Sequence, residues 1–370
     1  MKKMKASSSL RLIAFFLVAT ILVCAFGFSA DGWQLKSEGA SPAPQQSTQK
    51  PATNNTPLPE NGNNTETPPQ PEPPKFYNYL TGEETTEELS SLRHTAFVLN
   101  PAAPMYGISS SDLIIEFPIE DGSTRLLSFI NDPTNIAKIG SLASNRNYIT
   151  NLAVAFGATL FSIGNDDTVE YSKCSVDEKN IIDTDVTNYI YTEFARFSYT
   201  SGALVNDAFA TNGYINSKAE IPCPFLFNQS DDTPIKGDSI FNEITIPYSA
   251  SSKTVLSYSH ETATYFLEKN SSKMSDMATS SAVDFTNCFV LFADSVTYEN
   301  QSSTQMVLST MGHGTGYYFT KGTAKQITWS LSEDGRLVFL DDTSNELIVN
   351  KGKTFISFVK SSQISDITLS

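Results

Sequence analysis

The chain has 370 residues, of which 40% are hydrophobic and 11% aromatic, so it can form one large or two ordinary domains. Its formal net charge is −15 at pH 7, with 40 acidic residues against 25 basic ones. A chain with this negative charge is repelled by the phosphate backbones of nucleic acids. We therefore expect no nucleic-acid partner.

Residues 1–30 have the pattern of a signal or membrane-anchor segment. Three lysines and Arg11 precede an uncharged run from Leu12 to Ala30, which is nearly long enough to span a bilayer as a helix. The basic flank predicts that the following chain lies outside the cytoplasm, at the cell membrane. Three outcomes stay open: a retained anchor, cleavage after Gly27, or cleavage before Cys24, which then carries lipid.

Residues 31–75 are predicted to be a disordered tether. Residues 41–75 hold 10 of the 18 prolines and very few apolar side chains. Such a segment cannot bury enough surface to offset its ordering entropy, so it is expected to hold the folded region away from the membrane.

Residues 76–235 are predicted to form a mixed α+β half. Alternating or continuous apolar runs, separated by Pro118 and by Asp121-Gly122, predict strands, and apolar residues at helical spacing predict helices. The expected strands are 95–100, 112–117, 123–130 and 158–164, and the expected helices are 147–157, 187–197 and 202–210.

Residues 236–360 are predicted to form a β-rich, mainly antiparallel half, followed by a tail at 361–370. Ten strand-like runs with turn residues between them recur every eight to twelve positions, a spacing typical of all-β units. The predicted fold class of the whole folded region is therefore α+β.

The stretch GHGTGYYFTKG, residues 312–322, has the glycines of a phosphate loop but not its context. It lacks the lysine and hydroxyl pair of such a loop, and a strand follows it where a helix is needed. We expect a glycine bend that leads into a hairpin with its tip at Thr320–Thr323.

No metal or cofactor site is expected from the histidines and cysteines. The three histidines, His94, His260 and His313, form no zinc-binding pattern, and no pair of cysteines has metal-ligand spacing. Cys174, Cys223 and Cys288 would lie outside the cell, where one disulfide is possible, but the sequence does not choose the pair.

Glu116, Arg125 and Arg146 are the charged residues with the most interesting positions. Glu116 and Arg125 each lie inside an otherwise apolar strand, and a hairpin across residues 118–123 would let them meet as an ion pair. One interpretation is that such a pair only stabilises the fold. In the other, Glu116 acts as an acid or base while an arginine stabilises an anion.

Five stretches of the sequence together resemble the YerB-like family of bacterial envelope lipoproteins, whose molecular function is undetermined. The stretches at 107–130 and 314–329 are the specific ones, and the others are 78–89, 138–158 and 350–359. The resemblance implies an extracytoplasmic protein with an α+β N-terminal half and a β-rich C-terminal half. It implies no established activity.

The resemblance also carries over individual positions. The matching residues are Glu116, Gly122, Thr124, Arg125, Gly140, Ser144 and Arg146. Ser141 and Ala143 stand where the family has proline and arginine, and Phe197-Ser198 where it has histidine and asparagine. These departures imply that the chain keeps the scaffold while its site has changed or been lost.

The sequence thus predicts a membrane-tethered extracytoplasmic binding or accessory protein of the cell envelope. Its expected ligand-binding residues are Glu116, Arg125, Ser144 and Arg146, and its expected partners are a cell-wall polymer, a peptide or an envelope protein. A cell-wall-directed enzyme and a purely structural envelope component are the alternatives. The oligomeric state is left open.

Overall fold

The computed structural model describes residues 73–161, 163, 181–182, 188–213, 216–217, 223–230, 233–299, 304–332 and 335–370. All of them belong to one compact unit, Gln70–Ser370. The predicted anchor segment, Cys24 and nearly all of the tether fall outside these ranges. Across the described residues, no helix combines the length and the apolar character needed to cross a membrane.

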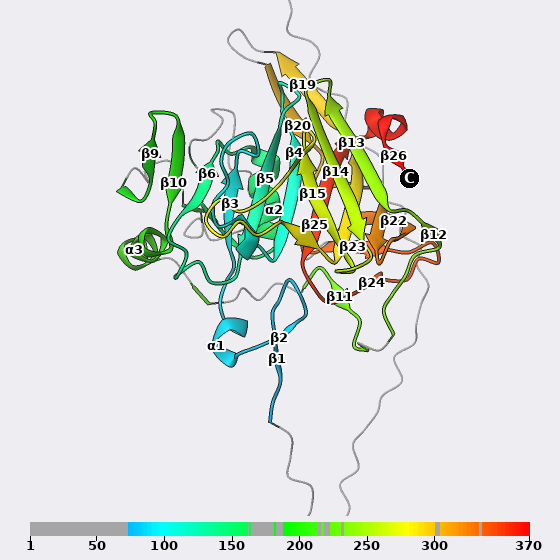
Figure 1. Ribbon diagram of the computed structural model, residues 1–370, viewed down its shortest axis with the longest axis horizontal. Coiled ribbons are helices and arrows are strands. Elements are labelled where there is room, and N and C mark those ends of the chain that lie inside the picture. The colour runs from blue at the N-terminus through cyan, green and yellow to red at the C-terminus, as the bar shows by residue number, and fades with distance from the viewer. Residues whose placement is uncertain are drawn as a thin grey trace, which may run out of the picture. The chain divides into compact units, whose positions relative to one another are not determined.

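A mixed sheet, which has 14 strands within the described ranges, organises the fold (Figure 1). At its centre, β4 runs parallel to β25, and β25 runs parallel to β18, so strands from both predicted halves form one sheet. The boundary predicted near residue 235 therefore separates two sequence regions that share a sheet. The strands are β3 (Thr95–Leu99), β4 (Leu113–Pro118), β5 (Thr124–Ile130), β6 (Ile139–Leu142), β7 (Thr159–Phe161), β8 (Ile181–Ile182), β9 (Tyr191–Glu193), β10 (Phe197–Thr200), β12 (Ser239–Ile240), β18 (Asn287–Ala293), β21 (His313–Thr320), β22 (Thr323–Leu331), β23 (Leu337–Leu340) and β25 (Thr354–Lys360).

A smaller antiparallel sheet packs on one face of the main sheet. Alternation along β13 turns Ile244, Ile246 and Tyr248 inward, where they join the same apolar cluster as Ile114 of β4 and Val290 of β18. The predicted tail is part of this sheet, because β26 pairs with β13 after a 3-10 helix at Ser361–Asp366. The strands are β13 (Glu243–Ser249), β14 (Ser252–Ser259), β15 (Thr264–Lys269), β16 (Ser272–Lys273), β17 (Asp284–Phe285) and β26 (Thr368–Leu369).

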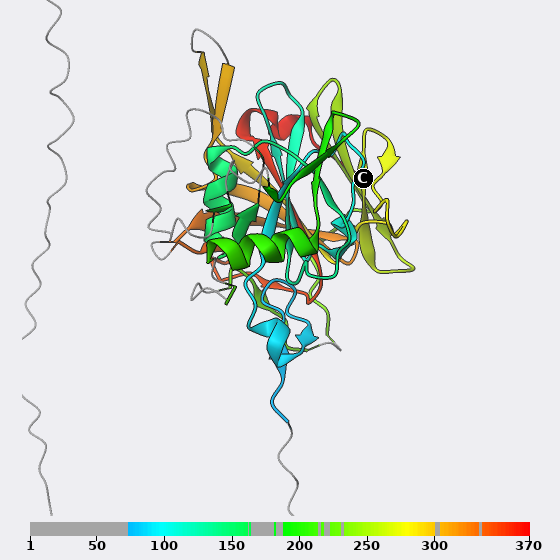
Figure 2. The ribbon, with the colours of Figure 1, turned by 90° about the vertical axis from the view of Figure 1, so that its left-hand side faces the viewer.

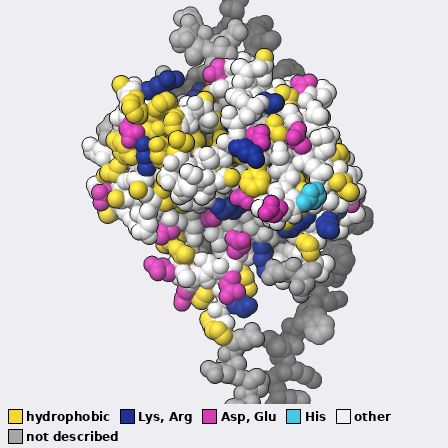
Figure 3. Space-filling model, in the orientation of Figure 1, with side chains coloured by type: hydrophobic (Ala, Val, Ile, Leu, Met, Phe, Trp, Pro, Cys, Tyr) yellow, Lys and Arg dark blue, Asp and Glu magenta, His cyan; other side chains and the backbone are white. Residues whose placement is uncertain are grey.

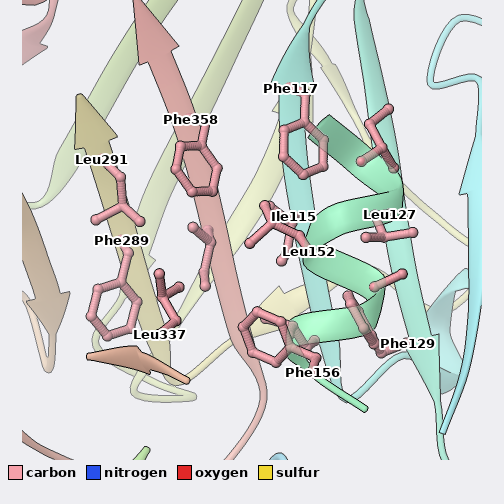
Figure 4. Packing of buried hydrophobic residues seen from close by; sticks show 14 of the residues in the cluster. Ile115, Phe117, Leu127, Phe129, Leu152, Phe156, Phe289, Leu291, Leu337 and Phe358 are labelled. Atoms are coloured by element: carbon pink, nitrogen blue, oxygen red, sulfur yellow. The ribbon is translucent and has the colours of Figure 1, made fainter. Parts of the chain in front are cut away.

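Helix α2 (Asn147–Ala155) covers the other face of the main sheet. Its Leu152 and the following Phe156 pack against side chains such as Ile115 and Phe129 on β4 and β5 (Figure 4). Helix α3 (Gly202–Asn212) lies beside the β9–β10 edge, prominent in Figure 2. Smaller elements complete the unit: β1 (Phe76–Tyr77), β2 (Glu84–Thr85), α1 (Glu87–Ser90), a 3-10 turn at Ile108–Ser110, β11 (Leu226–Phe227), β19 (Ser295–Glu299), β20 (Thr304–Leu308) and β24 (Ile348–Val349).

The described residues are mostly β, so the predicted α+β class matches only loosely. The helices expected at 147–157 and 202–210 are confirmed, and the side chain of Ser201 caps α3 by accepting a hydrogen bond from the Leu204 amide. The helix expected at 187–197 is wrong, because this segment contains β9 and the turn to β10. Phe194 and Ala195 adopt positive φ angles there, which a continuing helix does not allow.

The expected hairpin with its tip at Thr320–Thr323 is confirmed, but the expected glycine bend before it is wrong, because Gly314 and Gly316 lie inside strand β21. Strands β21 and β22 pair from His313↔Ser330 to Thr320↔Thr323, and the turn residues Lys321 and Gly322 both have positive φ angles. Gly314 and Gly316 allow β21 to pack closely against β18. A Cβ atom on Gly316 would lie 2.5 Å from the Val290 carbonyl oxygen on β18.

Candidate functional site

The register of the β4–β5 hairpin places Glu116 and Arg125 on opposite faces of the main sheet. Glu116 pairs with Leu126, while Arg125 pairs with Phe117. Because cross-strand partners share a face and neighbours along a strand alternate, Glu116 faces the smaller sheet and Arg125 faces the α2 side. The predicted Glu116–Arg125 ion pair is therefore wrong, since it would require the other register.

Glu116 instead belongs to a buried polar network between the two sheets. Its carboxylate is fully buried and accepts a hydrogen bond from Lys269 Nζ at 2.6 Å. Thr254 Oγ1 and the Tyr248 hydroxyl donate to the second carboxylate oxygen at 2.7 and 3.2 Å. Ser357 Oγ hydrogen-bonds to the same tyrosine hydroxyl. The network joins strands from both halves of the chain.

This environment favours an architectural role for Glu116. Lys269 Nζ also donates to Thr254 Oγ1 at 2.8 Å and to Thr124 Oγ1 at 3.1 Å, so the cation and the carboxylate satisfy each other within the core. A general acid or base must come within hydrogen-bond reach of its substrate, and a carboxylate without exposed surface does not. The acid–base hypothesis for Glu116 therefore has no geometric support.

Arg146 lies at the N-terminus of α2 and binds Glu120 in a bidentate manner. Its Nε and Nη2 atoms donate to the two Glu120 carboxylate oxygens at 2.8 and 2.9 Å. Its Nη1 atom donates to Ser144 Oγ at 3.2 Å and to the Asn145 carbonyl at 2.8 Å. The predicted site residues Ser144 and Arg146 therefore come together, and Glu120 joins them. We call Glu120, Arg125, Ser144 and Arg146 the arginine site.

Arg125 is the least satisfied member of the arginine site. Its Nη1 atom donates to the Thr124 carbonyl at 3.1 Å. Its Nε atom is buried without a hydrogen-bond partner among the described residues, where Arg125 also forms no ion pair. An unsatisfied buried donor costs about 1–3 kcal/mol, so such an atom calls for an explanation.

The charges of the arginine site influence one another. Burial and then the positive charge of Arg146 lower the pKa of Arg125, although Asp121 and Glu120 partly offset them. Burial raises the pKa of Glu120, but the hydrogen bond and charge of Arg146, together with hydrogen bonds from the backbone of Glu120 and Met306, outweigh it, so the net shift is downward. A hydrogen bond from Ser123 is the main cause of the lowered pKa of Asp121. The lowered pKa values keep Glu120 and Asp121 ionised near the guanidinium group of Arg125, which makes only one hydrogen bond among the described residues.

The positions at which this chain departs from the family pattern lie side by side. Strand β6 contains Ser141, β10 contains Phe197 and Ser198, and these two strands pair with each other. Ala143, just after β6, is buried in the apolar cluster beneath α2, so no charged group stands at that position. The residues that depart from the family pattern therefore lie in one region of the fold, which is next to Ser144 and Arg146 in the chain.

The described residues contain no group of three or more His, Cys, Asp or Glu side chains arranged to hold a metal ion. Cys288 is a buried free cysteine whose pKa is raised by burial. The Cys223 thiol donates to the Tyr79 carbonyl at 3.0 Å, and Cys174 lies outside the described residues.

Sequence reasoning missed Glu120 and Lys269. Glu120 is the second residue after β4, in the turn sequence IEDG of the β4–β5 hairpin, so the sequence already places it near Arg125. Its pairing with Arg146 depends on where α2 packs. No sequence signal connects Glu116 with Lys269, which is 153 residues away. Their contact exists only because the two sheets stack.

These features define a β-rich protein of two stacked sheets with a partly buried site that contains Arg125 and Arg146. The sequence models of two domains of a protein family of unknown function (DUF3048) match the chain, the N-terminal domain at residues 80–217 and the C-terminal domain at 244–356. The chain belongs to this YerB-like family.

Among solved structures, the crystal structure of the YerB protein from Bacillus subtilis is similar to this chain with a TM-score of 0.68. The two are 20% identical, and the similarity covers 80% of this chain and 100% of the YerB chain. Identity this low supports the shared fold alone. A search of curated proteins finds no match.

Proposed function

We propose that this protein is a membrane-tethered binding protein of the cell envelope that holds a carboxylate group of a cell-wall peptide at Arg125. The observation that carries the proposal is Arg125, a partly exposed arginine that forms no ion pair among the described residues and donates a hydrogen bond only to the Thr124 carbonyl there. A carboxylate that approaches the end of the guanidinium group can accept from Nη1 and Nη2 together, a bidentate geometry that arginine offers.

The neighbours of Arg125 support this role. Arg146 is already engaged by Glu120 and Ser144, so its guanidinium group is held in place and leaves Arg125 as the arginine available to a ligand. Arg125 and Arg146 project from a strand and a helix start, which position a ligand more accurately than loops do. The arginine site therefore suits recognition of an anionic group.

The location rests on the sequence of the first 75 residues. The lysine-flanked apolar run predicts a membrane segment with the folded region on the extracytoplasmic side. Val23, immediately before Cys24, is a poor context for lipidation, so we favour a retained anchor.

Binding of wall peptides to a fragment of residues 70–370 tests the proposal. A peptide with a free C-terminal carboxylate should bind, and its amidated form should not. Arg125→Gln should weaken binding about 10- to 100-fold, the effect of losing a charge-assisted bidentate contact. Arg196→Gln, which alters an exposed arginine at the β9–β10 turn, is the matched control and should bind normally. Equal affinity of the Arg125→Gln and parent fragments would refute the proposed site.

A further inference from the structure

A row of aromatic residues crosses the main sheet at the edge formed by β6, β9 and β10. Gly140 of β6 pairs with Tyr106 on one side and with Tyr199 of β10 on the other, and Tyr199 pairs with Tyr191 of β9. Since cross-strand partners share a face, the three tyrosines lie on one face with Gly140 between them. The missing side chain of Gly140 leaves room for the rings, because a Cβ atom there would lie 2.8 Å from the Tyr199 ring.

Lys138 fills the space above this row. It lies two residues before Gly140, immediately before β6, and its ammonium group lies over the ring of Tyr106. The Lys138 Nζ atom is 4.1 Å from the Tyr106 ring centroid and 3.9 Å from the Tyr199 ring centroid. Both distances are well within the range of cation–π attraction. Figure 3 shows hydrophobic side chains, a class that includes tyrosine, gathered over β6, β9 and β10.

Glu193 completes the coordination of the Lys138 ammonium group. Glu193 is two residues after Tyr191 on β9, so it faces the same side, and its Oε2 atom accepts from Lys138 Nζ at 2.6 Å. Partial burial disfavours the charged lysine, but the Glu193 hydrogen bond and the tyrosines outweigh this and raise the pKa of Lys138. Two aromatic faces and one carboxylate are the groups with which proteins recognise an ammonium ion.

We propose that Tyr106, Tyr191, Tyr199 and Glu193 form a binding site for a primary ammonium group, which Lys138 of the same chain occupies as an internal ligand. The Lys138 side chain is 17% exposed and that of Glu193 is 38% exposed, so the site is accessible from solvent. Lys138 has a flexible four-carbon stem and can swing outward. A ligand with an unbranched alkylammonium group, such as a lysine side chain of a peptide, then takes its place.

We choose a primary ammonium group because the tyrosine rings and the Glu193 carboxylate make different demands on the ligand. The rings attract any cation, whereas Glu193 at 2.6 Å requires an N–H donor. A quaternary ammonium ion has no such donor and is too wide for that contact. This site is separate from the arginine site in chemistry, since it takes a cation, and its test does not depend on carboxylate binding.

The first experiment removes the internal ligand from the 70–370 fragment. In Lys138→Ala, n-butylammonium, which reproduces the lysine side chain, should bind saturably with a Kd on the order of millimolar, as expected for so small a ligand. The parent fragment should bind it at least 10-fold more weakly, because Lys138 competes. Lys138→Met is the matched control: its apolar side chain fills the same space and should also block n-butylammonium.

Selectivity and chemical protection provide the remaining tests. Tetramethylammonium should bind Lys138→Ala several-fold more weakly than n-butylammonium, and Glu193→Gln in the Lys138→Ala background should remove that preference. In the parent fragment, an amine-acylating reagent should modify Lys138 several-fold more slowly than the exposed Lys75, which keeps the proposal testable if Lys138→Ala does not fold. A folded Lys138→Ala that binds n-butylammonium no better than the parent, or acylation of Lys138 as fast as that of Lys75, overturns the proposal.

Discussion

Replacing Lys269 by methionine tests the buried network around Glu116. The substitution keeps most of the side-chain volume and removes the cation that lies 2.6 Å from a fully buried carboxylate. Breaking a buried ion pair by removing one partner typically costs about 3–5 kcal/mol. Thr254 and Tyr248 still donate to the carboxylate, each worth about 1 kcal/mol, so we expect a loss near the lower end, about 3 kcal/mol.

Urea unfolding of the 70–370 fragment measures this loss. Lys273→Met, an exposed lysine on β16, is the matched control and should change the free energy of unfolding by less than about 0.5 kcal/mol. In the double variant Glu116→Gln/Lys269→Met, the loss should be about 1–3 kcal/mol smaller than the sum of the single losses, because the two side chains are in contact. A loss below about 1 kcal/mol for Lys269→Met would show that water or another group stabilises Glu116, and the architectural interpretation would then be wrong.

Three further predictions concern other parts of the chain. The pKa of Glu120 is lowered in the folded protein, so its ion pair with Arg146 stabilises the fold at pH values above 4.5, the ordinary pKa of the carboxyl group. This stabilisation is lost as the pH falls through the lower pKa of the folded state. The stability difference between the parent and Glu120→Gln, followed by thermal unfolding, should therefore shrink below about pH 4.5, and a pH-independent difference would contradict this. Gly316→Ala should lower stability by about 1–3 kcal/mol in urea unfolding because its Cβ atom would meet the Val290 carbonyl, whereas an unchanged midpoint would mean that β18 and β21 can separate. A reporter fused after Pro74 should be active outside the cytoplasm, and Cys24→Ala should leave membrane fractionation unchanged; activity only in the cytosol would refute the proposed location.

The sequence alone determined most of the strands. The apolar runs at 95–100, 112–117 and 123–130 became β3, β4 and β5, because local alternation and turn residues specify short strands and hairpins. The same reasoning located the two longer helices and the hairpin tip at Thr320–Thr323. It failed at 187–197, where apolar residues fit helical spacing but positive φ angles at Phe194 and Ala195 turn the chain back into a hairpin.

Only the tertiary structure decided the sites. Register placed Glu116 and Arg125 on opposite faces, and a shift of one residue would have reversed that outcome. Stacking of the sheets brought Lys269 to Glu116, and the packing of α2 brought Arg146 to Glu120. The physical reason is distance along the chain. Local sequence sets the conformation of a strand, whereas the partner of a side chain can lie 26 residues away, as for Arg146 and Glu120, or 153 residues away, as for Lys269 and Glu116. Such partners are brought together by the burial of whole faces.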